Sequence, residues 1–210
     1  MKNENLPNIR HTLAHLLASV VLETYPGTKN TIGPAIDDGF YYDFEFPTDI
    51  KLSDKDLPDL QMKMKKALNS WKEFTHKEVS ETEAKEFFKG NEYKIELIEE
   101  IVKKGEKITL YTCGDFTDLC RGGHSENPSK EISADGFKLS RVAGAYWRGS
   151  EDNKQLTRIY GLAFATGEEL DAYEKMKAEA EKRDHRKLGK ELDLFEFDND
   201  VGPGLPLWLP

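Results

Sequence analysis

Two pairs of side chains in this sequence can bring nitrogen or sulfur atoms to one point. The first pair is His11 and His15, and the second is Cys120 and His124, two residues after Asp118. The members of each pair are four positions apart, and residues at i and i+4 share one face of a helix. Three imidazoles and one thiol or thiolate are a ligand set typical of tetrahedral zinc. The same groups also suit a metal-free site that holds and polarises a water.

Each of these residues taken alone is compatible with an ordinary core or surface position. The sequence holds only five histidines, however, so two such pairs together favour a shared site. A zinc-bound water is one hypothesis, with all four residues as candidate ligands. Four protein ligands would close a tetrahedral site, which favours either three ligands plus water or no catalytic metal. A Cys120 thiolate nucleophile with His124 as its base is disfavoured, because no separate acid orients the histidine.

The first pair is predicted to lie on a helix over residues 7–25. Its core side carries apolar residues at the 3, 4, 7 spacing, including Ile9, Leu13 and Leu17. Successive helical residues are 100° apart, so His11 and His15 fall on nearly the opposite side, among small residues. The imidazoles are therefore expected to face a second surface, which would form the floor of a cleft.

Other elements are expected to surround this cleft. Residues 31–46 predict a hairpin that turns at Asp38-Gly39, with Tyr42 on the inward face as part of a pocket or of the core. Ser53 with Asp56, and Ser80 with Glu83, are capping-box signals for two helices. The remaining expectations are a strand or helix at 93–98, a strand at 107–113, the second pair in a loop or helix entry, two strands at 137–148 and 156–165, a charge-rich helix at 167–190 and a new segment from 194.

Composition excludes several classes of protein. The 210 residues are 38% hydrophobic, enough for a core, and carry a formal net charge of −9, which argues against non-specific phosphate binding. No apolar run approaches the length of a membrane span, so no membrane partner is expected. Only Cys113 and Cys120 are present, and the N-terminus shows no signal-peptide pattern. We therefore expect a cytoplasmic location.

Several longer motifs carry a family resemblance over essentially the whole chain. HTLAHLL, IGPAIDDGFYYDF, DLCRGGH, RVAGAYWRG, RIYGLAFAT and RDHRKLGKELDLF resemble the editing region of threonyl-tRNA synthetase and the helix that leads into its catalytic core. The related editing region of alanyl-tRNA synthetase shares the HxxxH and CxxxH pairs. The resemblance implies an α+β fold, an antiparallel sheet packed with helices and followed by a long C-terminal linker helix. It divides the chain into an editing domain at 1–166, the linker helix at 167–192 and the start of a class II synthetase core at 193–210.

The resemblance also implies an activity. Threonine and serine differ by one methyl group, which a synthetic site distinguishes by only about 1–3 kcal/mol. A second site in this family hydrolyses the ester of mischarged seryl-tRNA(Thr). No cofactor is required for that reaction, and zinc remains the alternative. ATP and the zinc of the catalytic core are expected only in a full-length enzyme, so this chain should not carry out ATP-dependent aminoacylation.

Site roles follow from the motifs that match the family. His11 and Lys94 are expected to hold and activate the water and to assist the leaving ribose hydroxyl. Asp118 is expected to bind the amino group of the substrate by a charge-assisted hydrogen bond. His15, Cys120 and His124 would shape the serine pocket, with Tyr42 at its boundary. Basic residues near the motifs are candidates for binding phosphates: Arg121, Lys138, Arg141, Arg148 and Lys154.

The expected partner is the acceptor end of tRNA(Thr). A full-length enzyme is expected to be a homodimer, and this fragment a monomer. Two alternatives stay open at this point: a tRNA-binding module without turnover, and a structural zinc module. Hydrolytic activity would argue against the first, and unfolding on chelation without activity would support the second.

Overall fold

The structure is a computed structural model that describes residues 5–197 and 206–208. The chain divides into two compact units, Met1–Gly167 and Glu168–Pro210, and each is described by itself. Within the described residues, none of the helices combines the length and the apolar character needed to cross a membrane.

A five-stranded antiparallel sheet forms the larger part of the first unit. Its strands are β1 (Lys29–Asn30), β2 (Ala35–Ile36), β3 (Gly39–Glu45), β7 (Phe137–Tyr146) and β8 (Gln155–Ala163). The order is β1-β3-β8-β7, and β2 pairs with β3. The predicted hairpins at 31–46 and 137–165 are both present. The first hairpin turns at Asp37 and Asp38 rather than at Asp38 and Gly39, because Gly39 already pairs with Ile36. Gly39 also packs closely on β8, since a Cβ added to it would lie 1.9 Å from the carbonyl oxygen of Gly161.

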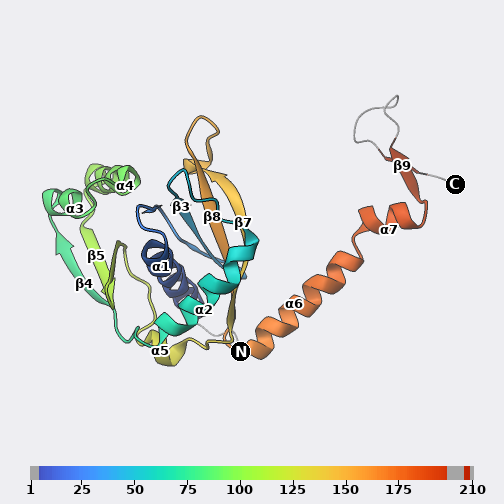
Figure 1. The fold of residues 1–210 in the computed structure, drawn as a ribbon, viewed down its shortest axis with the longest axis horizontal. Helices are drawn as coiled ribbons and strands as arrows, with labels where there is room; N and C mark the ends of the chain where they lie inside the picture. The colour runs from blue at the N-terminus through green and yellow to red at the C-terminus, as the bar shows by residue number, and fades with distance from the viewer. Residues whose placement is uncertain (1–4, 198–205, 209–210) are drawn as a thin grey trace. The chain divides into compact units, whose positions relative to one another are not determined.

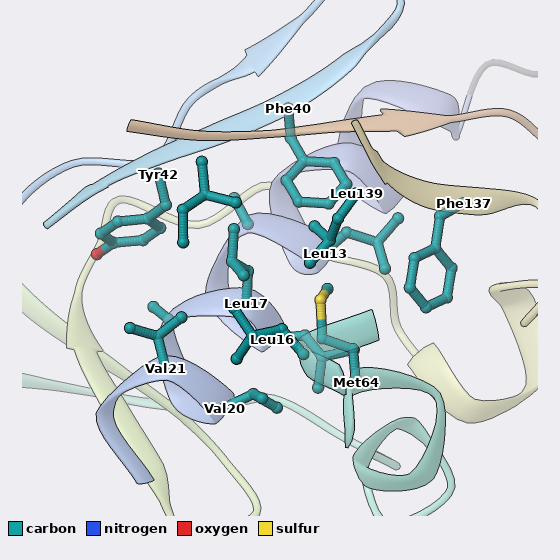
Figure 2. Close-up of a cluster of buried hydrophobic side chains, with 14 of the residues drawn as sticks. Leu13, Leu16, Leu17, Val20, Val21, Phe40, Tyr42, Met64, Phe137 and Leu139 are labelled. Carbon is teal, nitrogen blue, oxygen red and sulfur yellow. The ribbon is translucent and has the colours of Figure 1, made fainter. Parts of the chain in front are cut away.

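Two helices pack on one face of this sheet, α1 (Leu6–Thr24) and α2 (Leu57–Leu68) (Figure 1). The apolar side predicted for α1 is buried against β3 and α2, and its other side is buried as well, since Ala14, His15 and Ala18 have almost no exposed surface. The core is drawn in Figure 2, where α1 contributes Leu13, Leu16, Leu17, Val20 and Val21, β3 contributes Phe40 and Tyr42, α2 contributes Met64, and β7 contributes Phe137 and Leu139.

A second, three-stranded antiparallel sheet lies in the same unit. It contains β4 (Thr75–Val79), β5 (Ile108–Cys113) and β6 (Phe116–Leu119) in that order. Two helices, α3 (Glu81–Phe87) and α4 (Glu92–Lys103), form a small core with β5. The segment at 93–98, left open between strand and helix, is helical. The sequence did not predict β4 or β6.

Short elements complete the first unit: η1 (Asp54–Asp56), α5 (Pro128–Glu131) and η2 (Trp147–Gly149). Both predicted capping boxes form, since the side chains of Asp56 and Glu83 accept hydrogen bonds from the backbone N–H groups of Ser53 and Ser80. The Ser53 box starts a single 3₁₀ turn, and α2 follows directly. The described fold is therefore the predicted α+β fold, in which an antiparallel sheet packs against helices.

The second unit contains two helices and a short hairpin. The helices are α6 (Gly167–Lys182) and α7 (His185–Glu191), and the hairpin pairs β9 (Phe195–Phe197) with β10 (Pro206–Trp208). The prediction of one continuous helix over 167–190 is wrong. The backbone carbonyl of Asp184 accepts hydrogen bonds from the backbone N–H groups of Lys187 and Leu188, so Asp184 stands directly before a new helix, at a position where aspartate is favoured.

Candidate functional site

The helix α1 supplies the first pair of histidines. His15 is 4% exposed and His11 is half-buried. The Nδ1 atom of His11 lies 3.2 Å from the carbonyl oxygen of Gly123, and the Nε2 atoms of the two histidines lie 3.1 Å apart. The i, i+4 spacing therefore does bring both imidazoles together, as the sequence indicated.

The second pair lies in a loop directly after β6, so a helical face does not explain its convergence. Gly122 and Gly123 have φ angles of 96° and 84°, which side chains other than glycine rarely adopt, and they curl the loop around Cys120. The backbone N–H of Gly122 donates to the Cys120 sulfur at 3.3 Å. The backbone N–H of Ser125 donates to Oγ1 of Thr12, which ties the loop to α1.

The four side chains form one compact cluster. The Cys120 sulfur lies 3.2 Å from Nε2 of His124 and 3.5 Å from Nε2 of His11. One donor atom from each of the four residues lies within 4.8 Å of the others. The partners of His11 and His15 at Nδ1, a carbonyl and a carboxylate, are those usual for zinc-bound histidines. The donor set therefore fits a tetrahedral zinc ion.

Asp118, on β6, lies next to the cluster and is 1% exposed. Its Oδ1 accepts hydrogen bonds from Lys94 Nζ at 2.5 Å and from the backbone N–H of Leu119 at 2.8 Å. Its Oδ2 accepts from the Tyr42 hydroxyl at 2.6 Å and lies 3.3 Å from His15 Nδ1. Burial alone would raise the pKa of this carboxyl, but Lys94 and His15 hold the pKa well below its usual range. An ionised carboxylate has about four acceptor sites, and all four have partners.

The expected contact between Asp118 and a substrate amino group therefore meets an obstacle in this geometry. Because each acceptor site of the carboxylate already has a donor, an incoming ammonium group would have to displace one of them. Asp118 is placed instead to hold Lys94, His15 and Tyr42 in fixed positions.

The hydrogen bonds also assign the protons of the two α1 histidines. The carbonyl of Gly123 and the carboxylate of Asp118 only accept, so Nδ1 of both histidines carries a proton. With the two Nε2 atoms 3.1 Å apart, one of these must carry a proton as well. Burial opposes a charge on His15, but its hydrogen bonds to Asp118 and Cys120 raise the pKa of His15 to about 9. His15 is thus an imidazolium that donates to His11.

Cys120 carries the compensating negative charge. Burial would raise the pKa of this thiol, but its contacts with the rings of His11, His124 and His15 lower the pKa to about 3. Burial lowers the pKa of His124, so this ring is neutral and its Nε2–H donates to the thiolate. Nδ1 of His124 is buried and has no partner among the described residues. Because no described residue orients His124 through this nitrogen, the geometry argues against a Cys120 nucleophile with His124 as its base.

Lys94 lies in the first turn of α4 and is 2% exposed. Asn91 caps this helix, since its side-chain oxygen accepts from the backbone N–H of Lys94, and its amide donates to the carbonyl of Asn30 at 2.9 Å. The Asn30 amide in turn donates to the Tyr42 hydroxyl at 3.1 Å. Sequence reasoning missed both asparagines. The only available signal was an asparagine before an apolar periodic segment, as expected of a cap.

A cavity of about 460 Å³ opens at this network. Seven predicted site residues line it: His11, His15, Tyr42, Lys94, Asp118, Cys120 and Arg121. His124 does not line this cavity; it lines a second one together with Phe74, and the centroids of their stacked rings lie 4.0 Å apart. The backbone of Gly33 closes the cavity against Tyr42, and a Cβ at this glycine would lie 2.1 Å from the tyrosine ring.

The predicted phosphate-binding residues are not gathered at the cavity. Only Arg121 among the five lines it. Arg141 stacks over the ring of Tyr160, on the sheet. Three of the five are in ion pairs, Arg121 with Glu106, Arg148 with Glu96 and Glu100, and Lys154 with Glu45. Acidic neighbours therefore neutralise much of the basic surface that the sequence suggested.

Comparisons with known proteins agree with the resemblance drawn from the motifs. A family model described as the threonyl and alanyl tRNA synthetase second additional domain matches residues 108–160. The chain is 50% identical over 208 residues to a threonine--tRNA ligase of Staphylococcus carnosus, covering 99% of this chain and 31% of that protein. It is also 50% identical over 208 residues to that of Rubrobacter xylanophilus, covering 99% and 32%. The chain thus spans about a third of the length of the curated relatives it matches, and it is similar to them over nearly its whole length.

Proposed function

We propose that this chain is the editing region of a threonine--tRNA ligase and hydrolyses the ester of mischarged seryl-tRNA(Thr). The observation that carries the proposal is the charged network around Asp118, in which a buried lysine and an imidazolium are fixed at the wall of a cavity. Such fixed charges in a site shielded from water are suited to stabilise a developing oxyanion. The likeness to threonine--tRNA ligases supports the choice of substrate.

The reaction forms a bond between the water oxygen and the ester carbon and breaks the bond from that carbon to the ribose oxygen. One proton of the water ends on the ribose hydroxyl. His11 lines the cavity, and its Nε2 can take this proton and pass it on once that atom is released from the hydrogen bond with His15. Cys120, as a thiolate 3.5 Å away, stabilises positive charge on the two rings.

Lys94 is proposed to hold the water or the ester carbonyl. The ammonium group has three N–H donors, and two are used by Asp118 and Tyr42. The third has no partner among the described residues, so it can donate into the cavity that Lys94 lines. Asp118 fixes the position of this ammonium group through their ion pair.

A zinc module is the second candidate, favoured by the fit of the four donor atoms. His11, His15, Cys120 and His124 would hold the ion, which would supply folding energy and fix the loop after β6 to α1. Four protein ligands leave no position for a substrate water, so this candidate predicts a structural role.

Several properties of a whole ligase are proposed from the same likeness. We expect tRNA(Thr) to present its acceptor end to the cavity, a homodimer for the complete ligase and a location in the cytoplasm. We expect ATP-dependent aminoacylation to require the parts of the longer relatives that this chain does not match.

The test compares hydrolysis of seryl-tRNA(Thr) and threonyl-tRNA(Thr) by the wild-type chain and by His11→Ala. We expect the seryl ester to be hydrolysed faster, and the His11→Ala rate to fall by roughly 10²–10⁴-fold, the usual contribution of a general acid–base group. The control is His76→Ala, which removes a histidine that stacks on Tyr111 outside the cavity.

Equal rates on the two esters, or full activity without His11, would contradict the editing proposal. Metal content measured on the same samples separates the candidates. One zinc per chain, together with unfolding on chelation and no hydrolysis, would establish the structural role instead.

A further inference from the structure

One face of α4 follows the cavity from its inner end to its mouth. Lys94, Leu97, Ile101 and Lys104 are spaced by three, four and three residues, and all four line the cavity. This spacing places side chains in one stripe along a helix. Ten residues of helix rise about 15 Å, so the two lysines lie at opposite ends of the stripe.

The inner end of the stripe is occupied by the network of Lys94, Asp118 and His15. The middle is different in character, because Leu97 and Ile101 are aliphatic, and Ile32 and Pro34 line the same cavity. A cavity of about 460 Å³ is of the size that holds drug-sized ligands, which is more than the serine of an ester occupies. The aliphatic middle section suits the flat face of a nucleobase, so it can receive the nucleoside that carries the ester.

Three cationic residues line the mouth, but two of them have acidic partners. Lys107 pairs with Glu78 at 2.8 Å, and Arg121 pairs with Glu106 at 2.5 Å. Lys104 directly follows α4 and makes no ion pair with any residue that the structure describes. Glu100 also lines the cavity, but Arg148 holds its carboxylate at 2.5 Å. Among the residues that the structure describes, the mouth therefore offers one cation, Lys104, that has no carboxylate partner.

We propose that Lys104 binds the phosphodiester that joins the last two nucleotides of the acceptor end, while Leu97 and Ile101 contact the terminal nucleoside. The inference rests on the proposed function, and it assigns a residue that the motifs did not indicate. Lys104 acts on binding alone, since it lies at the opposite end of the stripe from the reacting groups.

The experiment uses Lys104→Ala with Lys103→Ala as its matched control. Both residues are exposed lysines at the same helix end, and only Lys104 lines the cavity. Hydrolysis of seryl-tRNA(Thr) is measured over a range of salt concentrations. For Lys104→Ala we expect KM to rise roughly tenfold with kcat unchanged, as for the loss of one charged hydrogen bond. The slope of log(kcat/KM) against log[salt] should become shallower by about 0.7, the value for one phosphate contact on a single strand.

A second substrate, the seryl ester of adenosine, contains no phosphate. Lys104→Ala should hydrolyse it at the wild-type rate. The proposal is overturned if the two lysine variants behave alike on the tRNA, or if Lys104→Ala is equally impaired on the adenosine ester.

A wild-type chain that hydrolyses neither substrate would refute the proposed function but not the binding role. In that case the binding role of Lys104 is tested by measuring the affinity of each variant for an RNA hairpin with a single-stranded 3′ end. Weaker binding by Lys104→Ala than by Lys103→Ala supports the assignment, and equal binding overturns it.

Discussion

Cys120 and His15 carry opposite charges inside one cluster at neutral pH. The thiolate and the imidazolium together hold as many protons as a neutral thiol and a neutral imidazole. Between about pH 6.5 and 8.5 the folded and unfolded chains therefore bind equal numbers of protons at these two residues. Below that range the unfolded chain binds one more proton than the folded chain at these two residues, because an unfolded histidine is then protonated as well.

Cys120→Ala should therefore change how stability depends on pH. Between pH 4.5 and 6.5 the folded Cys120, with a pKa of about 3, is a thiolate, and the unfolded residue is a thiol. The unfolded chain binds one more proton, so this group makes the free energy of unfolding rise by about 1.4 kcal/mol per pH unit. The substitution should remove that slope, as measured by urea unfolding at pH 4.5, 5.5 and 6.5.

Cys113→Ala is the control, because burial raises the pKa of Cys113 to about 11 and keeps it a thiol in both states. It should leave the slope unchanged. Parallel pH profiles for wild type and Cys120→Ala would show that Cys120 is not ionised in the folded chain.

The candidate site was only partly predictable at the scale of residues. The two pairs stood out because histidine and cysteine are rare and the spacing was regular. Asn30, Asn91 and Lys104 did not, because asparagine is common in turns and an exposed lysine has no distinguishing neighbours in a sequence. The roles of the two asparagines depend on a contact between segments about 60 residues apart, in which the amide of Asn91 donates to the carbonyl of Asn30.

Among the elements, α4 brings Lys94 to the site, and Asn91 caps its first turn. Asn91→Ala should lower the free energy of unfolding by about 1 kcal/mol, the usual loss for a helix cap. Because the same side chain holds Lys94 and Asn30, we also expect the rate of seryl-tRNA hydrolysis to fall roughly tenfold. Urea unfolding and a deacylation assay on the same protein measure the two effects.

Ser80→Ala provides the comparison, since Ser80 caps the neighbouring helix α3 and contacts no site residue. Ser80→Ala should lower the free energy of unfolding by a similar amount and leave the rate of seryl-tRNA hydrolysis unchanged. If both variants lose the same activity, the effect of Asn91 is only structural.

The elements differed in how well their sequences specified them. The apolar period of α1 and the capping boxes at Ser53 and Ser80 are local signals, and the structure contains them. The strand β4 has no such signal, because all five of its residues are exposed or half-exposed and show no alternation. It forms through pairing with β5, which lies about 30 residues later in the chain.

At the scale of the whole molecule, every residue of the proposed site lies in the first unit. A chain ending at Gly167 should therefore fold and hydrolyse seryl-tRNA(Thr) at a rate within about threefold of the 210-residue chain. The measurement is a deacylation assay with a urea unfolding curve for each protein. A folded but inactive 1–167 chain would show that residues of the second unit take part in the reaction.

The four hydrogen bonds on Asp118 have a consequence for the order of folding. Three of the donors come from α1, β3 and α4, which are far from Asp118 in the sequence, and the fourth is the backbone of the adjacent Leu119. A buried carboxylate without partners costs several kcal/mol, so Asp118 can leave water only after these elements have met. Contacts between distant segments form late, because each requires a long loop to close. The site should therefore be among the last regions to become native, and a newly made chain acquires its charged network only when the rest of the unit is in place.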